Sequence, residues 1–125
     1  MDDANVPSLL AMSYLGYEPE SQEVADNTRK LILSEANPFY YAGTKLSGIG
    51  SPHTPVRYVW HISKAIEGLT APTKEEKHQM IQELMATDGG TGLMHEGVFV
   101  DDPTVYTREW FSWANAMFCE LVMQY

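Results

Sequence analysis

The sequence has 125 residues, of which 44% are hydrophobic, 11% aromatic and 20% charged. This composition is typical of one globular domain with a core and excludes an intrinsically disordered chain. The formal net charge is −9 with only 8 Lys and Arg residues, so the chain lacks the basic surface that binds phosphates and we expect no nucleic-acid partner. A neutral or cationic ligand suits this charge better.

The single cysteine, Cys119, excludes an internal disulfide and a multi-cysteine metal cluster. Because it lies inside an apolar helical segment, we expect it to be a small buried residue. No apolar run approaches the roughly 20 residues of a membrane span, so no membrane segment is expected. The N-terminal stretch MDDANVPS lacks the basic and apolar regions of a signal peptide.

Helical periodicity dominates the chain, because period-two alternation never extends beyond a few residues. Helices are predicted over residues 7–15, 21–34, 56–69, 73–88 and 108–123. The helix from residue 73 has the clearest ends, since Thr73 and Glu76 form a capping box and Asp88-Gly89-Gly90 is a typical C-terminal stop.

The predicted helices differ in how they distribute apolar residues. The fourth is amphipathic, and its inward positions are Met80, Ile81, Leu84 and Met85. The fifth is apolar nearly all round, with a stripe of Trp110, Trp113, Ala114, Met117 and Leu121. Such a helix is predicted to be buried on all sides. The second and fourth helices are amphipathic, whereas the third and fifth are more buried. This alternation indicates two layers of helices, and the predicted fold class is all-α.

A long stretch without periodicity, NPFYYAGTKLSGIGSPHTP, covers residues 37–55 and holds three prolines and three glycines. Its composition predicts a loop, and its length favours a functional one. At its end, Pro52 and Pro55 stiffen the backbone around His53 and pre-organise this side chain for a hydrogen bond. The alternative is a rigid loop in which Thr54 only caps the next helix.

The turn-rich stretch GTGLMHEGVF, residues 91–100, places His95 beside Glu96. The pair could be solvated turn residues. A zinc-protease helix needs a second histidine four residues after the first, but position 99 is Phe99, so no metal site is predicted. The remaining interpretation is that Glu96 is a general base and that His95 orients it or contacts the substrate. Because the loops of His53 and Glu96 each precede a helix predicted to be buried, we expect the two loops to converge on the same side.

Two further features allow two interpretations each. The segment Asp2-Asp3-Ala4-Asn5 could be a helix cap whose acidic residues suit the helix dipole, or part of a polar site. The aromatic residues could stack on sugar rings or pack in the core; they are Phe39, Tyr40, Tyr41, Trp60, Trp110 and Trp113. Core packing is the better interpretation for Trp113.

Five stretches resemble glycoside hydrolase family 125, the exo-acting α-mannosidases, in the order in which the family has them: MDDANVPSLL, YLGY, NPFYYAGTKLSGIGSPHTP, GTGLMHE and DDPTVYTREWFSWANAMF. The resemblance implies an (α/α)6 barrel that hydrolyses α-1,6-linked mannose at the non-reducing end, with inversion and without a metal or another cofactor. The implied partner is a mannose-containing oligosaccharide or glycan.

The resemblance also implies roles for individual residues. Glu96 corresponds to the family's general base, and the family's Ser-Pro-His-Thr loop implies substrate contacts for His53 and Thr54. His95, which precedes the base in the family's Met-His-Glu segment, is likewise implied to contact the substrate. The family's Asp-Asp-Ala-Asn segment, at the pocket rim or floor, implies substrate contacts for Asp2, Asp3 and Asn5. The family commonly has serine after the base, where this chain has Gly97.

The family's general acid is an aspartate upstream of the Asp-Asp-Ala-Asn segment, so no residue of this chain corresponds to it. Residues 1–125 therefore resemble roughly the last third of the enzyme, the C-terminal part of the catalytic domain with an incomplete barrel. Inverting hydrolysis needs two carboxyl groups about 6.5–9.5 Å apart. Two functions stay open: part of a mannosidase, or an inactive helical remnant with at most weak sugar binding.

Overall fold

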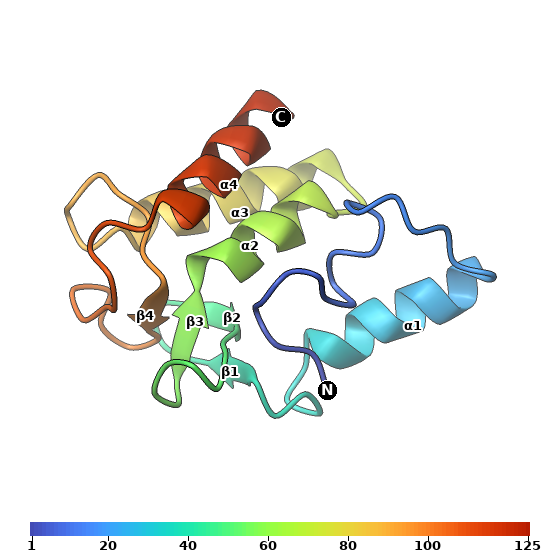
Figure 1. The fold of residues 1–125 in the computed structure, drawn as a ribbon, viewed down its shortest axis with the longest axis horizontal. Helices are drawn as coiled ribbons and strands as arrows, with labels where there is room; N and C mark the ends of the chain where they lie inside the picture. The colour runs from blue at the N-terminus through green and yellow to red at the C-terminus, as the bar shows by residue number, and fades with distance from the viewer.

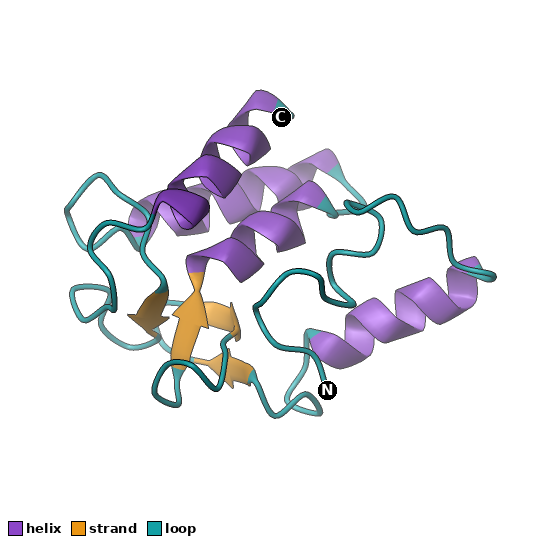
Figure 2. Cartoon of the chain, in the orientation of Figure 1, coloured by secondary structure: helices purple, strands orange, loops and turns teal.

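The computed structural model describes all residues from 1 to 125 and shows an α+β fold of four helices and four short strands (Figures 1 and 2). The helices are α1 (Gln22–Ile32), α2 (His61–Leu69), α3 (Lys74–Ala86) and α4 (Ser112–Met123). The strands are β1 (Tyr40–Ala42), β2 (Ser47–Ile49), β3 (Tyr58–Trp60) and β4 (Gly97–Phe99). The predicted all-α fold is therefore wrong, and this structure does not support the (α/α)6 barrel.

The strands form two antiparallel pairs. In the first pair Tyr40 of β1 lies opposite Ile49 of β2, and in the second Trp60 of β3 lies opposite Gly97 of β4. Each strand has three residues. A strand this short cannot display the alternation of apolar and polar residues by which strands are recognised, which explains why the sequence predicted only helices.

Of the five predicted helices, two are present near their predicted bounds and three differ from the prediction. The helices predicted over 21–34 and 73–88 are present, and the hydroxyl of Thr73 caps α3 by accepting the Glu76 N–H at 3.2 Å. Residues 7–15 instead form isolated turns, and residues 108–111 precede α4. The predicted third helix begins only at His61, because residues 58–60, rich in strand-favouring side chains, first pair with β4.

Helix α2 is the centre of the core. It packs against α3 and α4, whereas α1 lies to one side beside the N-terminal segment (Figure 1). The buried residues at these contacts include Ile62, Ala65, Ile66, Met80, Ile81, Leu84, Ala114, Met117 and Leu121. Met85, predicted to point inward, is 62% exposed instead. None of the helices combines the length and the apolar character needed to span a membrane.

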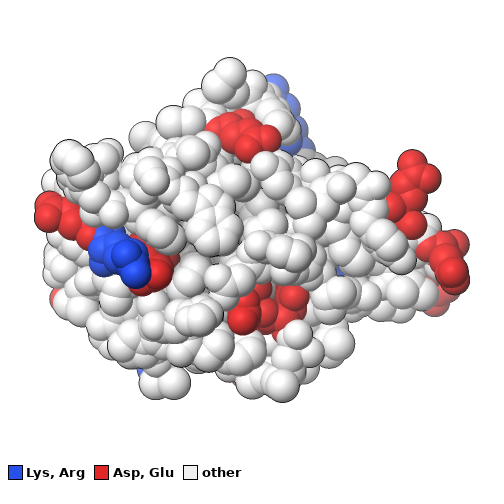
Figure 3. All heavy atoms as spheres, viewed as in Figure 1, with Lys and Arg blue, Asp and Glu red and all other residues white.

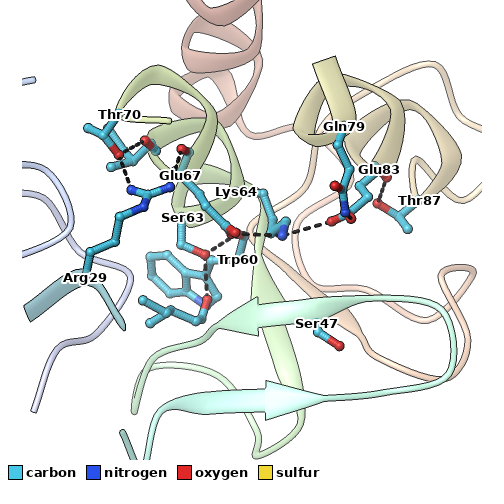
Figure 4. Close-up of polar contacts among 12 residues, drawn as sticks. Arg29, Ser47, Trp60, Ser63, Lys64, Glu67, Thr70, Gln79, Glu83 and Thr87 are labelled. Atoms are coloured by element: carbon cyan, nitrogen blue, oxygen red, sulfur yellow. Dashed lines mark hydrogen bonds and ion pairs between the residues drawn. The ribbon is translucent and has the colours of Figure 1, made fainter. Parts of the chain in front are cut away.

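A buried lysine also links α2 to α3 (Figure 4). The Lys64 ammonium group lies 2.8 Å from a carboxylate oxygen of Glu67 and 2.9 Å from one of Glu83. Burial disfavours the charged amine, but the two carboxylates outweigh burial and raise the pKa of Lys64. The core thus contains a charged connection between helices that periodicity alone does not reveal.

Helix α4 is not buried on all sides, contrary to prediction. Ala114, Met117 and Leu121 face the core, but Met123 is 87% exposed and Cys119 is also exposed. Trp110, just before the helix, is 85% exposed, and Trp113, expected in the core, is 38% exposed. The reason is that no other element of residues 1–125 covers the outer side of this helix.

Asp2 fixes the N-terminal segment in place. Its buried carboxylate accepts the N–H groups of Leu9 at 2.9 Å and Leu10 at 3.0 Å. Its carbonyl oxygen accepts a hydrogen bond from the Asn37 side chain at 2.7 Å. Asp2 therefore closes the loop of residues 2–10 and ties it to the segment that follows α1.

We predict that Asp2→Ala lowers the free energy of unfolding by about 1–3 kcal/mol, because two buried amide donors lose a charged acceptor. Asp2→Asn keeps the shape and one acceptor oxygen, so a smaller loss is expected. Urea denaturation at micromolar protein concentration measures both values. Equal stability of wild type and Asp2→Ala would show that water replaces the carboxylate without cost.

Candidate active site around Glu96

The backbone of Glu96 connects the start of α2 to the strip of residues 106–108. Its carbonyl oxygen accepts the His61 N–H at 3.3 Å, which satisfies one of the free amides at the N-terminus of α2. Its own N–H donates to the carbonyl of Thr107 at 3.2 Å. The glutamate is therefore held between two elements that are distant in sequence, immediately before β4.

Two neighbours orient the Glu96 carboxylate. The Thr107 hydroxyl donates to Oε1 at 3.1 Å, and Arg108 Nε donates to Oε2 at 3.1 Å. The Glu96 side chain is 14% exposed and that of Arg108 is 64% exposed, so the carboxylate keeps limited access to solvent beside this ion pair. Each carboxylate oxygen has a second lone pair and can still accept a hydrogen bond from water.

Arg108 has a left-handed backbone with φ of 53°, which few residues other than glycine adopt. Its guanidinium carbon lies 5.8 Å from the centroid of the Phe111 ring. Strained backbone conformations of this kind cluster at functional sites. This conformation directs the Arg108 side chain to Glu96 and its carbonyl to the His95 ring.

His95 lies fully buried behind Glu96. Its Nε2 is 2.9 Å from the Asp88 carbonyl oxygen and its Nδ1 is 3.2 Å from the Arg108 carbonyl oxygen. The ring also stacks on Tyr106, with centroids 3.8 Å apart and an interplanar angle of 5°. A ring enclosed in this way fits the orienting role considered from sequence better than contact with a sugar.

His61 lies behind His95 and is held in one tautomer by its two hydrogen-bond partners. Its Nδ1 accepts the His95 N–H at 2.9 Å, and its Nε2 lies 3.2 Å from the Thr87 hydroxyl. Burial, followed by the nearby charge of His95, lowers the pKa of His61 to about 3. At neutral pH the ring is therefore uncharged and serves as an acceptor for the turn that carries Glu96.

We predict that His61 makes stability depend on pH. The unfolded chain binds a proton at His61 near pH 6.5 and the folded chain only near pH 3. The free energy of unfolding should therefore fall as pH is lowered through this window, by at most about 1.4 kcal/mol per pH unit from this group. Urea denaturation between pH 7 and pH 4.5 should give a flatter dependence for His61→Gln than for wild type; parallel curves would contradict the prediction.

The loops of His53 and Glu96 converge, as predicted. Trp60 Nε1 donates to the Thr54 hydroxyl at 2.9 Å, and the His53 ring lies 6.4 Å from the Trp60 ring. A Cβ atom at Gly97 would lie 3.3 Å from the Thr54 methyl carbon. The next residue after Glu96 therefore contacts the His53 loop, and glycine leaves more room there than a residue with a side chain would.

The N-terminal segment joins the same loop. Asn5 Nδ2 donates to the Ser51 hydroxyl at 3.2 Å and to an Asp3 carboxylate oxygen at 3.1 Å. The Ala4 N–H donates to the Gly50 carbonyl at 3.0 Å. The predicted site residues therefore form one connected region, in which His53 is exposed and Asp3 and Asn5 are half-buried.

Sequence reasoning assigned no role to Thr107 or Arg108. A signal was present: two apolar runs flank the turn Asp101-Asp102-Pro103-Thr104, a pattern typical of a hairpin. In the structure the Phe99 N–H donates to the Val105 carbonyl at 2.9 Å, so the chain does fold back here. Recognising this hairpin would have placed residues 106–108 beside Glu96.

The chain is similar to known proteins along almost its whole length. The family described as "Metal-independent alpha-mannosidase (GH125)" matches residues 1–123. A metal-independent α-mannosidase from Streptococcus pneumoniae, solved as a non-productive substrate complex with α-1,6-mannobiose, superposes with a TM-score of 0.96 at 58% identity. The match covers 99% of this chain and 29% of the pneumococcal chain.

The Meiotically up-regulated gene 157 protein of Schizosaccharomyces pombe is 48% identical over 124 residues, which are 98% of this chain and 24% of the yeast chain. This chain thus spans less than a third of either relative. The family match nevertheless covers almost all of its residues. The chain belongs to the metal-independent α-mannosidases of glycoside hydrolase family 125.

Proposed function

We propose that this chain supplies the general-base side of an α-mannosidase active site, with Glu96 as the base. The observation that carries the proposal is the Glu96 carboxylate itself, which is oriented by Thr107 and Arg108 and partly open to solvent. The buried histidines behind it hold the turn rigid, as a general base requires. Family membership supports a glycosidase reaction for this carboxylate.

In the proposed reaction Glu96 accepts a proton from a water molecule, whose oxygen attacks the anomeric carbon of a terminal α-1,6-linked mannose. The new C–O bond forms as the glycosidic C–O bond breaks, and the configuration inverts. The leaving oxygen takes a proton from a second carboxyl group about 6.5–9.5 Å from the base. We assign that acid to polypeptide outside residues 1–125, since no residue here corresponds to it.

The sugar contacts in this proposal come from the region joined to the Glu96 turn. His53 and Thr54 carry side-chain groups that can bond to sugar hydroxyls, and so do Asp3 and Asn5. Asn5, His53 and Thr54 each donate a hydrogen bond to Ser51, and Asn5 also donates to Asp3. The support for mannose is the pneumococcal relative, whose structure holds α-1,6-mannobiose.

A chimera tests the proposal. Residues 1–125 replace the matching segment of the pneumococcal α-mannosidase, and the unaltered pneumococcal enzyme is the control. We expect the chimera to release mannose from α-1,6-mannobiose, with β-mannose as the first product seen by NMR. A folded chimera without activity would overturn the proposal, and α-mannose as the first product would overturn inversion.

The alternative, an inactive chain that binds sugar weakly, is favoured for residues 1–125 on their own because they lack an assigned acid. We expect the isolated chain to release no mannose from α-1,6-mannobiose. Release of mannose by the isolated chain, abolished by Glu96→Gln, would show that the acid lies within these residues.

A further inference from the structure

A polar pocket lies between the β1–β2 hairpin and helices α2 and α3. Its volume is about 390 Å³, within the range of about 300–1,000 Å³ that is typical of small-molecule sites. None of the residues that line it belongs to the region around Glu96. Polar side chains from all four elements meet there, and they are Tyr40, Ser47, Lys64, Glu67, Gln79 and Glu83.

Lys64 places a buried charge in the wall of this pocket, between Glu67 and Glu83 (Figure 4). The charged side chains on the face shown in Figure 3 lie at the surface, whereas the Lys64 side chain is only 4% exposed. Its ammonium group has three N–H donors, and the two glutamates accept two of them. The third N–H, one carboxylate oxygen of Glu67 and the side-chain carbonyl oxygen of Gln79 have no hydrogen-bond partner within the chain. The pocket therefore offers both a donor and acceptors to a ligand.

These groups favour a neutral ligand with several hydroxyls. Two lysines, Lys45 and Lys64, and two glutamates line the pocket, so its formal charge is zero. Lys64 already occupies the place between the carboxylates that a metal ion would need, and the carboxylates repel an anion. A hydroxyl both donates and accepts, so it can satisfy the free N–H and the free oxygens together. The half-buried Tyr40 ring adds an apolar surface for the C–H groups of a sugar.

The pocket is formed before any ligand binds, because the β1–β2 hairpin is fixed on its far side. The N–H groups of Lys45 and Leu46 donate to the Val100 carbonyl oxygen at 3.0 Å and 3.1 Å. Gly43 packs so closely on Val100 that a side chain at this position would collide with it. The opposite wall is the packed pair of helices α2 and α3. A preformed site loses less conformational entropy when a ligand binds.

We propose that this pocket is a second carbohydrate-binding site, which takes one neutral hexose unit of an oligosaccharide. The free Lys64 N–H donates to a sugar hydroxyl, and Glu67 and Gln79 accept from sugar hydroxyls. The proposal goes beyond the proposed function, since it assigns no step of the reaction to the pocket and uses no residue near Glu96. A second binding site raises the effective concentration of an oligosaccharide at the chain.

Methyl NMR of residues 1–125 with isotope-labelled methionine methyl groups tests the proposal. Met80 lines the pocket and Met94 precedes the His95-Glu96 pair, so their signals report on the two sites separately. We expect α-1,6-mannobiose to shift the Met80 signal in a saturable way. Gln79→Trp places an indole ring at the pocket wall and should weaken this binding at least about tenfold, or about 1.4 kcal/mol. Gln82→Trp is the matched control, because it makes the same change at an exposed position of α3 outside the pocket.

An unchanged Met80 signal, or equal affinity of the two tryptophan variants, would overturn the proposal. A shift of Met94 alone would also overturn it while supporting the sugar contacts proposed around Glu96. A shift of Met80 alone would support it and count against those contacts. The chimera contains the same two methionines, so a titration with D-mannose gives the same test in a longer protein if the isolated chain does not fold.

Discussion

Replacing Glu96 by glutamine is expected to lower hydrolysis of α-1,6-mannobiose by the chimera about 10²–10⁴-fold, the usual contribution of a general base. The amide keeps the size of the carboxylate but cannot take a proton from the attacking water. It can rotate so that its oxygen faces Arg108 Nε and its NH₂ group faces the Thr107 hydroxyl, which can accept a hydrogen bond. The local structure should therefore survive the change.

Because the local structure is kept, Glu96→Gln should impair the chemical step and leave substrate binding nearly unchanged. The loss should appear in kcat, while KM for α-1,6-mannobiose stays close to that of the unsubstituted chimera. Glu109→Gln is the matched control, because it removes the same charge from an exposed residue close by and should leave kcat unchanged. Turnover by Glu96→Gln at the rate of the Glu109→Gln control would remove Glu96 from the mechanism.

Local signals in the sequence predicted part of this structure correctly. The capping box at Thr73 located the start of α3, and the Pro-flanked His53 loop and the Glu96 turn were expected on one side. These features depend on residues close together in the chain, or on the resemblance to a family. The strands depend instead on pairing between distant segments, as Trp60 pairs with Gly97, and three residues are too few to show it in sequence.

Two further discrepancies have a common cause. Cys119 and Trp113 were expected inside because α4 is apolar on nearly every side, yet both are exposed in part or in full. Apolar character predicts that a side chain will be covered but not by which polypeptide. Arg108 was missed for a similar reason, because its partnership with Glu96 requires the hairpin that brings residues 106–108 back along β4.

Lys64→Met is expected to cause the largest loss of stability among single substitutions outside the site. The Lys64 side chain is 4% exposed, and those of Glu67 and Glu83 are 17% and 30% exposed. Methionine can occupy the space of the lysine stem but leaves the two carboxylates without their shared cation. Breaking a buried ion pair from one side costs about 3–5 kcal/mol, and the partial exposure of the glutamates places the expected cost near the lower end.

Two companion variants separate charge from packing. Combining Lys64→Met with Glu67→Gln and Glu83→Gln removes the unpaired charges and should restore most of the lost stability, since neutral replacements of buried ion pairs are often well tolerated. Arg57→Met breaks an ion pair with Asp101 whose side chains are 46% and 33% exposed, and should cost less than about 1 kcal/mol. Urea denaturation measures all three variants. If the triple variant were as unstable as Lys64→Met, the unpaired carboxylates would not be the cause of the loss, and this explanation of the Lys64 effect would be wrong.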